Sequence, residues 1–159
     1  MRYAISIAYD GTDYGGWQIQ KNSVTVQEKL EEACAKAFGC RTCVTASGRT
    51  DSGVHAAGQV CHFDAETTIP AEKIADVLNI YLPQDIAVTK SVKAPADFDS
   101  NRWAKRKTYC YRMYLSRRRN PLKDRYSLFI KGEIDLEKLG DIAGIFEGEH
   151  DFKAYCKGG

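Results

Sequence analysis

Large apolar side chains stand at every second position near the start of the chain, at residues 3, 5, 7 and 9, with Ala or Ser between them. This period of two predicts a half-buried β-strand. The strand should end at Asp10-Gly11, a pair typical of turns. A second strand is predicted over residues 57–64, with Cys61 and Phe63 on one face, and a shorter one over residues 43–46. We expect these last two strands to pair in a hairpin-like way.

Two segments carry helical signals instead. Thr25 and Glu28 have the spacing of a capping box, apolar residues follow at positions 26, 30, 33 and 37, and Gly39 stands where a helix C-cap belongs. The pattern predicts an amphipathic helix of about 13 residues. Pro70 is suited to the first turn of a second helix, whose apolar face comprises positions 74, 77, 78 and 81, and Pro83 should end it.

With a further strand over residues 86–92, the predicted order is strand, helix, strand, strand, helix, strand. This order is typical of an α+β protein, specifically a ferredoxin-like α/β sandwich with both helices on one face of an antiparallel sheet. The other face would stay free for a ligand or a second domain. We expect this subdomain, with a candidate catalytic loop, to occupy residues 1–97.

Residues 98–159 have a different character, and we expect them to form a basic strand and the start of a second subdomain. Aromatic and apolar residues alternate with other residues over positions 108–115, which predicts a long strand. Asp135 could cap a third helix whose apolar positions 136, 139, 143 and 146 face inward. A new element should begin near Asp151-Phe152.

The chain has 159 residues, of which 43% are hydrophobic and 28% charged, as expected for one soluble domain or slightly more. It has no run of about 18 apolar residues and no apolar block at the N-terminus, which argues against membrane-spanning and secreted classes and favours the cytoplasm. We expect the six cysteines to be reduced thiols. Cys40 and Cys43 have zinc-like spacing but lack a second ligand pair, so we expect no metal.

Basic residues are concentrated between residues 102 and 125, where ten Lys and Arg residues stand against Asp124 alone. That segment has a net charge of +9, and since the whole chain carries +2, the remainder carries −7. Such a basic block on an acidic chain indicates a polyanion such as nucleic acid as a partner. The alternative is a solvated, Arg-rich surface strand and turn.

The segment from Gly48 to His55 combines a cation, a carboxylate and an imidazole in a glycine-bounded loop. Arg49 could keep Asp51 ionised by its opposite charge, and a carboxylate nucleophile must be ionised. The glycines would allow a substrate to approach closely. The alternative is an ordinary hairpin loop in which Asp51 hydrogen-bonds its own backbone.

Two tyrosines, Tyr109 and Tyr111, lie within the basic block. An aromatic ring beside Arg and Lys is a common platform for a single-stranded or flipped-out base. The alternative is that both tyrosines pack a core from one sheet face. We interpret Trp17, which follows Gly15 and Gly16, as a loop anchor rather than a ligand contact.

The segment from Gly48 to His55 closely resembles the active-site motif of the tRNA pseudouridine synthase A (TruA) family. This resemblance extends over residues 46–60. Further segments of this sequence match the family in the same order. They are Ala8 to Gln18, Val26 to Leu30, Leu78-Asn79 with Leu82 to Ile86, and Lys107 to Tyr111. The family normally has a second, related half after a segment similar to Gly148 to Phe152, so the chain is expected to be an N-terminal portion.

The resemblance implies roles for individual residues. Asp51 would be the catalytic nucleophile, with Arg49 as its ion-pair partner and an aid in keeping the target nucleotide out of the stack. Tyr109 would stack against the target uracil. Arg102, which follows Asn101 where the family usually has an Arg, would contact the RNA backbone. The remaining substrate-binding residues would be Lys107 and His55.

The resemblance also implies the reaction, the isomerisation of uridine to pseudouridine in the anticodon stem-loop of tRNA, at positions 38, 39 and 40. The glycosidic bond moves from the base nitrogen to C5, after attack by the nucleophile on either C1′ of the sugar or C6 of the uracil. No metal or cofactor is implied, and the complete protein would be a cytoplasmic homodimer. Two alternatives are a non-catalytic RNA-binding module, and a thiol or zinc protein built on Cys40 and Cys43.

Overall fold

The computed structural model describes residues 1–155, so Cys156, one of the six cysteines expected to be reduced, lies outside the described residues. The chain divides into two compact units, Met1–Lys107 and Thr108–Gly159. The division falls after residue 107, whereas the sequence suggested a boundary after residue 97. No helix in the described part of the chain is both long enough and apolar enough to cross a membrane.

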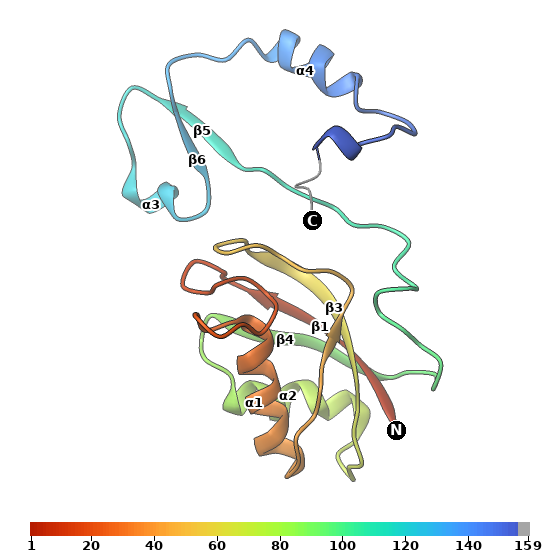
Figure 1. Cartoon of the computed structure of the whole chain (residues 1–159). Coiled ribbons are helices and arrows are strands. Elements are labelled where there is room, and N and C mark those ends of the chain that lie inside the picture. The colour runs from red at the N-terminus through yellow and green to blue at the C-terminus, as the bar shows by residue number, and fades with distance from the viewer. Residues whose placement is uncertain (156–159) are drawn as a thin grey trace. The chain divides into compact units, whose positions relative to one another are not determined.

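The first unit is an α+β structure built on one four-stranded antiparallel sheet with the strand order β2-β3-β1-β4. Both helices lie on the same side of this sheet (Figure 1). The predicted order of elements and the pairing of the two middle strands are confirmed. The elements are β1 (Arg2–Tyr9), α1 (Val26–Phe38), β2 (Thr45–Ala46), β3 (Ala56–Asp64), α2 (Ile74–Tyr81) and β4 (Ile86–Lys93).

The core lies between the helices and one face of the sheet. Along β1 every second side chain is buried, as the alternation predicts. These side chains pack with the apolar stripes of α1 and α2, and Trp17 is buried with them, which confirms it as a loop anchor. The largest apolar side chains that are completely buried are Phe63, Ile5, Ile7, Leu30, Ile74, Leu78 and Val26.

The α1 helix begins and ends at the residues that the sequence indicates. The Thr25 side chain accepts a hydrogen bond from the backbone of Glu28, and the Glu28 side chain accepts one from the backbone of Thr25. Gly39 ends the helix with a φ of 73°, a left-handed conformation that glycine adopts at little cost. The capping box and the C-cap are both confirmed.

The α2 helix follows a short 3₁₀ turn at Ala71–Lys73, which Pro70 precedes. A pair of hydrogen bonds ties this helix to β4. The Asn79 amide nitrogen donates to the carbonyl of Val88 at 2.9 Å, and the Val88 N–H donates to the Asn79 side-chain oxygen at 2.7 Å. A side chain thus satisfies backbone groups of the edge strand β4, whose outer side has no neighbouring strand in the described sheet.

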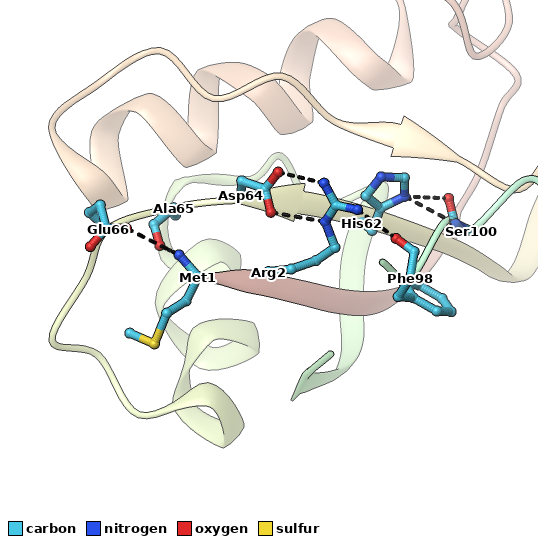
Figure 2. A network of polar contacts seen from close by, with 8 residues as sticks. All are labelled: Met1, Arg2, His62, Asp64, Ala65, Glu66, Phe98 and Ser100. Carbon is cyan, nitrogen blue, oxygen red and sulfur yellow. Dashed lines mark hydrogen bonds and ion pairs between the residues drawn. The ribbon is translucent and has the colours of Figure 1, made fainter. Parts of the chain in front are cut away.

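A polar network ties the start of β1 to the segment after β4 (Figure 2). The Arg2 guanidinium donates two hydrogen bonds to Asp64, at 2.9 and 2.7 Å, and a third to the carbonyl of Phe98 at 2.9 Å. The hydrogen bond from Arg2 is the main reason that the pKa of Asp64 lies below its ordinary value. Arg2 therefore joins β3 to the segment that leaves the sheet.

His62 and Ser100 form the second part of the network (Figure 2). Ser100 is buried, with 3% of its surface exposed. The Ser100 N–H donates to His62 Nδ1 at 3.1 Å, the Ser100 Oγ lies 2.9 Å from the same nitrogen, and the hydroxyl donates to the carbonyl of Thr45 at 2.9 Å. Burial, and then the charge of Arg2, lower the pKa of His62. Because these bonds fix residues 98–100 on the first sheet, the first unit extends beyond residue 97.

The second unit has two short parallel strands, β5 and β6, and it differs from the prediction. The expected long strand over residues 108–115 is wrong for its first half, because β5 begins only at Met113. A strand is stabilised by pairing, and β6 offers four residues to pair with. The elements are β5 (Met113–Ser116), α3 (Pro121–Asp124), β6 (Leu128–Lys131), α4 (Leu136–Gly144) and a 3₁₀ turn at Lys153–Tyr155.

The α4 helix begins as predicted, because the Asp135 side chain accepts a hydrogen bond from the backbone of Lys138. Its apolar side chains were expected to face inward, and this expectation is wrong for the described chain. Leu136, Leu139 and Phe146 are all exposed. An amphipathic helix gains most of its stability by burying its apolar face, and α4 buries none of its residues here.

Candidate active site

The predicted catalytic residues lie in the loop between β2 and β3. This loop, residues 47–55, is called the catalytic loop below. Arg49 and Asp51 are both exposed on it, and both line a pocket of about 240 Å³. The pocket brings the catalytic loop together with part of the loop that follows β1. Its lining residues are Gly15, Gln18, Ile19, Gln20, Arg49, Thr50, Asp51 and Ser52.

Tyr14, in the loop after β1, supports the catalytic loop from one side. Its carbonyl accepts a hydrogen bond from the Gly53 N–H and another from the Ser52 hydroxyl, both at 3.2 Å. Its own hydroxyl donates to Asp85 at 2.7 Å. Burial, followed by the hydrogen bond to Asp85, raises the pKa of Tyr14, so this phenol stays protonated and keeps donating.

His55, at the end of the catalytic loop, joins the two loops. Its Nδ1 accepts the Gly11 N–H at 3.1 Å and lies 3.0 Å from a carboxylate oxygen of Asp10. The backbones also touch here, since a Cβ on Gly11 would lie 2.0 Å from the carbonyl oxygen of Val54. Only glycine fits at that position. The resemblance implies substrate binding by His55, and in the structure its Nδ1 holds the turn after β1.

Arg49 and Asp51 line the same pocket but do not form the ion pair that the resemblance implies. Within residues 1–155, the ion pairs involve other residues, and neither side chain has a hydrogen-bond partner. Asp51 also does not bond its own backbone, which was the alternative for an ordinary hairpin loop. Both charged groups are therefore accessible from the pocket.

A third charge lies against the catalytic loop. The ammonium nitrogen of Lys107 is 3.0 Å from the position that a Cβ on Gly48 would occupy. The absence of a side chain at Gly48 thus lets the Lys107 side chain lie against the loop backbone. The loop that carries Asp51 is accordingly flanked by cations, as a site for a phosphodiester substrate requires.

Two other predicted substrate-binding residues, Arg102 and Tyr109, are exposed. The Arg102 side chain is 87% exposed, with only a 3.9 Å contact from Nε to Asp99. Tyr109 belongs to the second unit, precedes β5 and is 76% exposed, and Tyr111 is 87% exposed. Within residues 1–155 neither tyrosine packs into a core, contrary to what the alternative expected.

The sequence did not predict the part of the pocket that the loop after β1 supplies. Gln18, Ile19 and Gln20 form this wall. The Gln20 side-chain nitrogen donates to the carbonyl of Gly15 at 2.6 Å, and the Ile19 N–H donates to the Gln27 side chain at 3.2 Å. The only sequence signal for this wall is the Gly15-Gly16 pair, which permits the tight path of the chain before it.

No three potential metal-ligating side chains come together within residues 1–155. The described cysteines are free, and Cys40 and Cys43 are exposed.

Fold and site together define an α+β protein whose antiparallel sheet carries an Arg- and Asp-bearing loop at an open pocket. A sequence profile described as tRNA pseudouridine synthase matches residues 5–101, more than half of the chain. The chain belongs to the tRNA pseudouridine synthase family.

Curated relatives agree with this assignment. The tRNA pseudouridine synthase A of Geotalea uraniireducens is 42% identical over 149 residues, which cover 94% of this chain and 61% of the relative. That of Ruminiclostridium cellulolyticum is 42% identical over 151 residues, covering 95% and 62%. That of Halalkalibacterium halodurans is 40% identical over 156 residues, covering 98% and 59%. The chain therefore spans about three fifths of the length of these relatives.

Proposed function

We propose that this chain supplies the nucleophile-bearing part of a tRNA pseudouridine synthase, an isomerase that converts uridine to pseudouridine in the anticodon stem-loop of tRNA. The observation that carries the proposal is the exposed pair Arg49 and Asp51 at one pocket, on the loop with the strongest family resemblance. The names of the relatives support tRNA as the substrate.

In the proposed reaction Asp51 attacks the substrate nucleotide and the N-glycosidic bond breaks. An accessible carboxylate is compatible with attack on C1′ of the sugar and equally with attack on C6 of the uracil. The base then turns, C5 bonds to C1′, the hydrogen on C5 leaves as a proton, and the base nitrogen gains one. Asp51 is released unchanged, so the overall reaction is an isomerisation that consumes nothing.

The cations around the loop have roles in binding. A reacting uracil must leave the base stack, and the flanking phosphates then need positive partners. Arg49 in the pocket and Lys107 beside Gly48 would serve this purpose, and Arg102 would bind the RNA backbone. Tyr109, whose ring is exposed, would stack against the target base, and His55 would support the site from the end of the loop.

We further propose that the first unit is ferredoxin-like, supported by its element order and its sheet order β2-β3-β1-β4. Residues 98–159 would begin a second, related subdomain. The complete protein would be a homodimer in the cytoplasm. These statements rest on the resemblance to the family.

A second candidate function is RNA binding without catalysis. It is favoured by the exposed tyrosines, Tyr109 and Tyr111, among the basic residues of segment 102–125. Such a module would not need Arg49 and Asp51 at one pocket.

Tritium release from tRNA transcripts carrying 5-tritiated uridine distinguishes the two, because bond formation at C5 must expel the label. The chain is assayed alone and joined to the C-terminal part of one of the relatives above, because it spans about three fifths of their length. We expect release that is lost in Asp51→Asn and kept in Asp76→Asn, which makes the same change of charge on α2. Binding of tRNA without release by either form would contradict the proposed synthase and favour the binding module.

A further inference from the structure

The residue between the two catalytic candidates, Thr50, is held at two points. Its hydroxyl lies 2.8 Å from the hydroxyl of Tyr9, at the end of β1. Its carbonyl accepts the N–H of Trp17 at 3.0 Å. The side chains of Arg49 and Asp51 on either side of it are exposed and have no hydrogen-bond partner within residues 1–155. Thr50 is therefore a point where the catalytic loop is attached to the core, next to both catalytic candidates.

Tyr9 is a rigid partner for this attachment. It is 4% exposed, and its ring lies 6.1 Å from that of Trp17. The β1–β3 pairing shifts register between Ile7 and Tyr9, so that Tyr9 pairs with Ala56 directly after the catalytic loop. Irregularities of this kind redirect a side chain, and they are common next to active sites.

A third residue favours Tyr9 as the donor of the Tyr9–Thr50 hydrogen bond. The Gln59 side-chain nitrogen lies 3.5 Å from the Tyr9 oxygen and can only donate to it. The Tyr9 proton is then available for Thr50 Oγ1. Burial raises the pKa of Tyr9, so the phenol remains a donor at neutral pH.

The loop after β1 fixes Thr50 from the opposite side. Gly16 has a φ of +93°, and a Cβ on it would lie 2.6 Å from the Thr50 carbonyl oxygen. The two backbones are thus as close as glycine permits. With its hydroxyl bonded to Tyr9 and its carbonyl to the Trp17 N–H, Thr50 has little freedom to move.

We propose that Tyr9 and Thr50 are positioning residues that hold Asp51 and Arg49 in place for reaction, an inference that rests on the proposed function. They act through the loop backbone, because Tyr9 is buried and the Thr50 hydroxyl is bonded to it. A nucleophile on an irregular loop needs such support, because a displacement of about 1 Å can lower a rate by about 100-fold.

The kinetic test uses a matched pair at one position. Thr50→Val replaces the hydroxyl with a methyl group of similar size, and Thr50→Ser keeps the hydroxyl. We expect kcat to fall by about 10- to 100-fold in Thr50→Val and in Tyr9→Phe, with KM changed by less than about threefold and with near-normal activity in Thr50→Ser. The double variant should lose no more than either single one, because both remove the same bond. Equal activity in Thr50→Val and Thr50→Ser would overturn the proposal.

An exchange measurement decides the matter independently of turnover. Amide hydrogen exchange of the 159-residue chain should be faster at Trp17 and Gly53 by at least about tenfold in Tyr9→Phe and Thr50→Val, and unchanged in Thr50→Ser and along β1. Unchanged exchange at both amides in both variants would overturn the proposal. If wild type shows no turnover in either form assayed above, the proposed function fails and this measurement alone decides whether Tyr9 and Thr50 fix the loop.

Discussion

Replacement of Ser100 by Ala should loosen the segment after β4 and destabilise the first unit. The Ser100 hydroxyl donates to the carbonyl of Thr45 at 2.9 Å and contacts His62 Nδ1 at the same distance. The Ser100 N–H still donates to His62 in the variant, at 3.1 Å in the wild type. The substitution therefore removes one hydroxyl from a buried position and takes one hydrogen bond away from the Thr45 carbonyl.

The size of the effect follows from the surroundings of the groups left behind. A buried polar group without a partner costs about 1–3 kcal/mol. Thr45 is exposed at the edge of the sheet, so water can reach its carbonyl, and we expect the lower part of that range, about 1–2 kcal/mol. For a domain of about 100 residues, each kcal/mol lowers Tm by about 4 °C, so a fall of roughly 4 to 8 °C is expected.

Ser91→Ala is the matched control. Ser91 is also buried, and its hydroxyl oxygen accepts the N–H of Ala75 at the start of α2, outside the network of His62 and Ser100. Both variants should lower Tm in a thermal melt, but only Ser100→Ala should speed amide exchange in peptides covering residues 98–103. A Tm within about 1 °C of wild type, with unchanged exchange in those peptides, would refute this reasoning about the network.

Three further predictions concern stability and the support of the site. Burial holds the folded-state pKa of His62 below its ordinary 6.5, so the unfolded chain binds the proton first as the pH falls. The free energy of unfolding should therefore fall as the pH drops below about 6.5. Urea titrations should show a flatter dependence of this free energy on pH in His62→Gln. Gly16→Ala should lower the free energy of unfolding by at least about 1–3 kcal/mol, because φ is positive and a Cβ would clash with the Thr50 carbonyl oxygen. A soluble variant with the wild-type Tm would contradict this. Thr25→Ala should cost about 1 kcal/mol in urea unfolding through loss of the α1 cap, whereas Lys36→Ala in the last turn of that helix should be nearly neutral.

The elements that the sequence predicted well have strong local causes. The α1 helix has a capping box at Thr25 and Glu28 and a glycine at its end, so its limits depend little on the rest of the chain. The alternation in β1 also identifies its buried face directly. These signals sufficed for the order of elements in the first unit.

The second unit was harder to predict, because its regular structure depends on pairing. Alternation over residues 108–115 is compatible with a strand, but only Met113–Ser116 has a partner, in β6. The apolar positions of α4 suggest a buried face, and none of the residues of this helix is buried in the structure. A periodic pattern indicates what a segment could bury and does not reveal what it packs against.

The candidate site was predicted only in part for a similar reason. Arg49 and Asp51 stand close in sequence, within a motif, and the structure brings both to one pocket. The wall from Gln18 to Gln20 and the attachment of Thr50 to Tyr9 arise from contacts between loops that are far apart in sequence. No spacing rule reveals such contacts, so these features required the structure.

The most direct test of the central claim, that Asp51 performs chemistry rather than binding, measures product formation and tRNA binding in the same samples. Wild type, Asp51→Asn and the control Asp76→Asn are each given tRNA transcripts, in whichever form of the chain turns over. We predict that Asp51→Asn lowers pseudouridine formation by at least about 1,000-fold while its tRNA Kd stays within about threefold of wild type. Pseudouridine formation by Asp51→Asn at a rate near that of wild type would contradict the account.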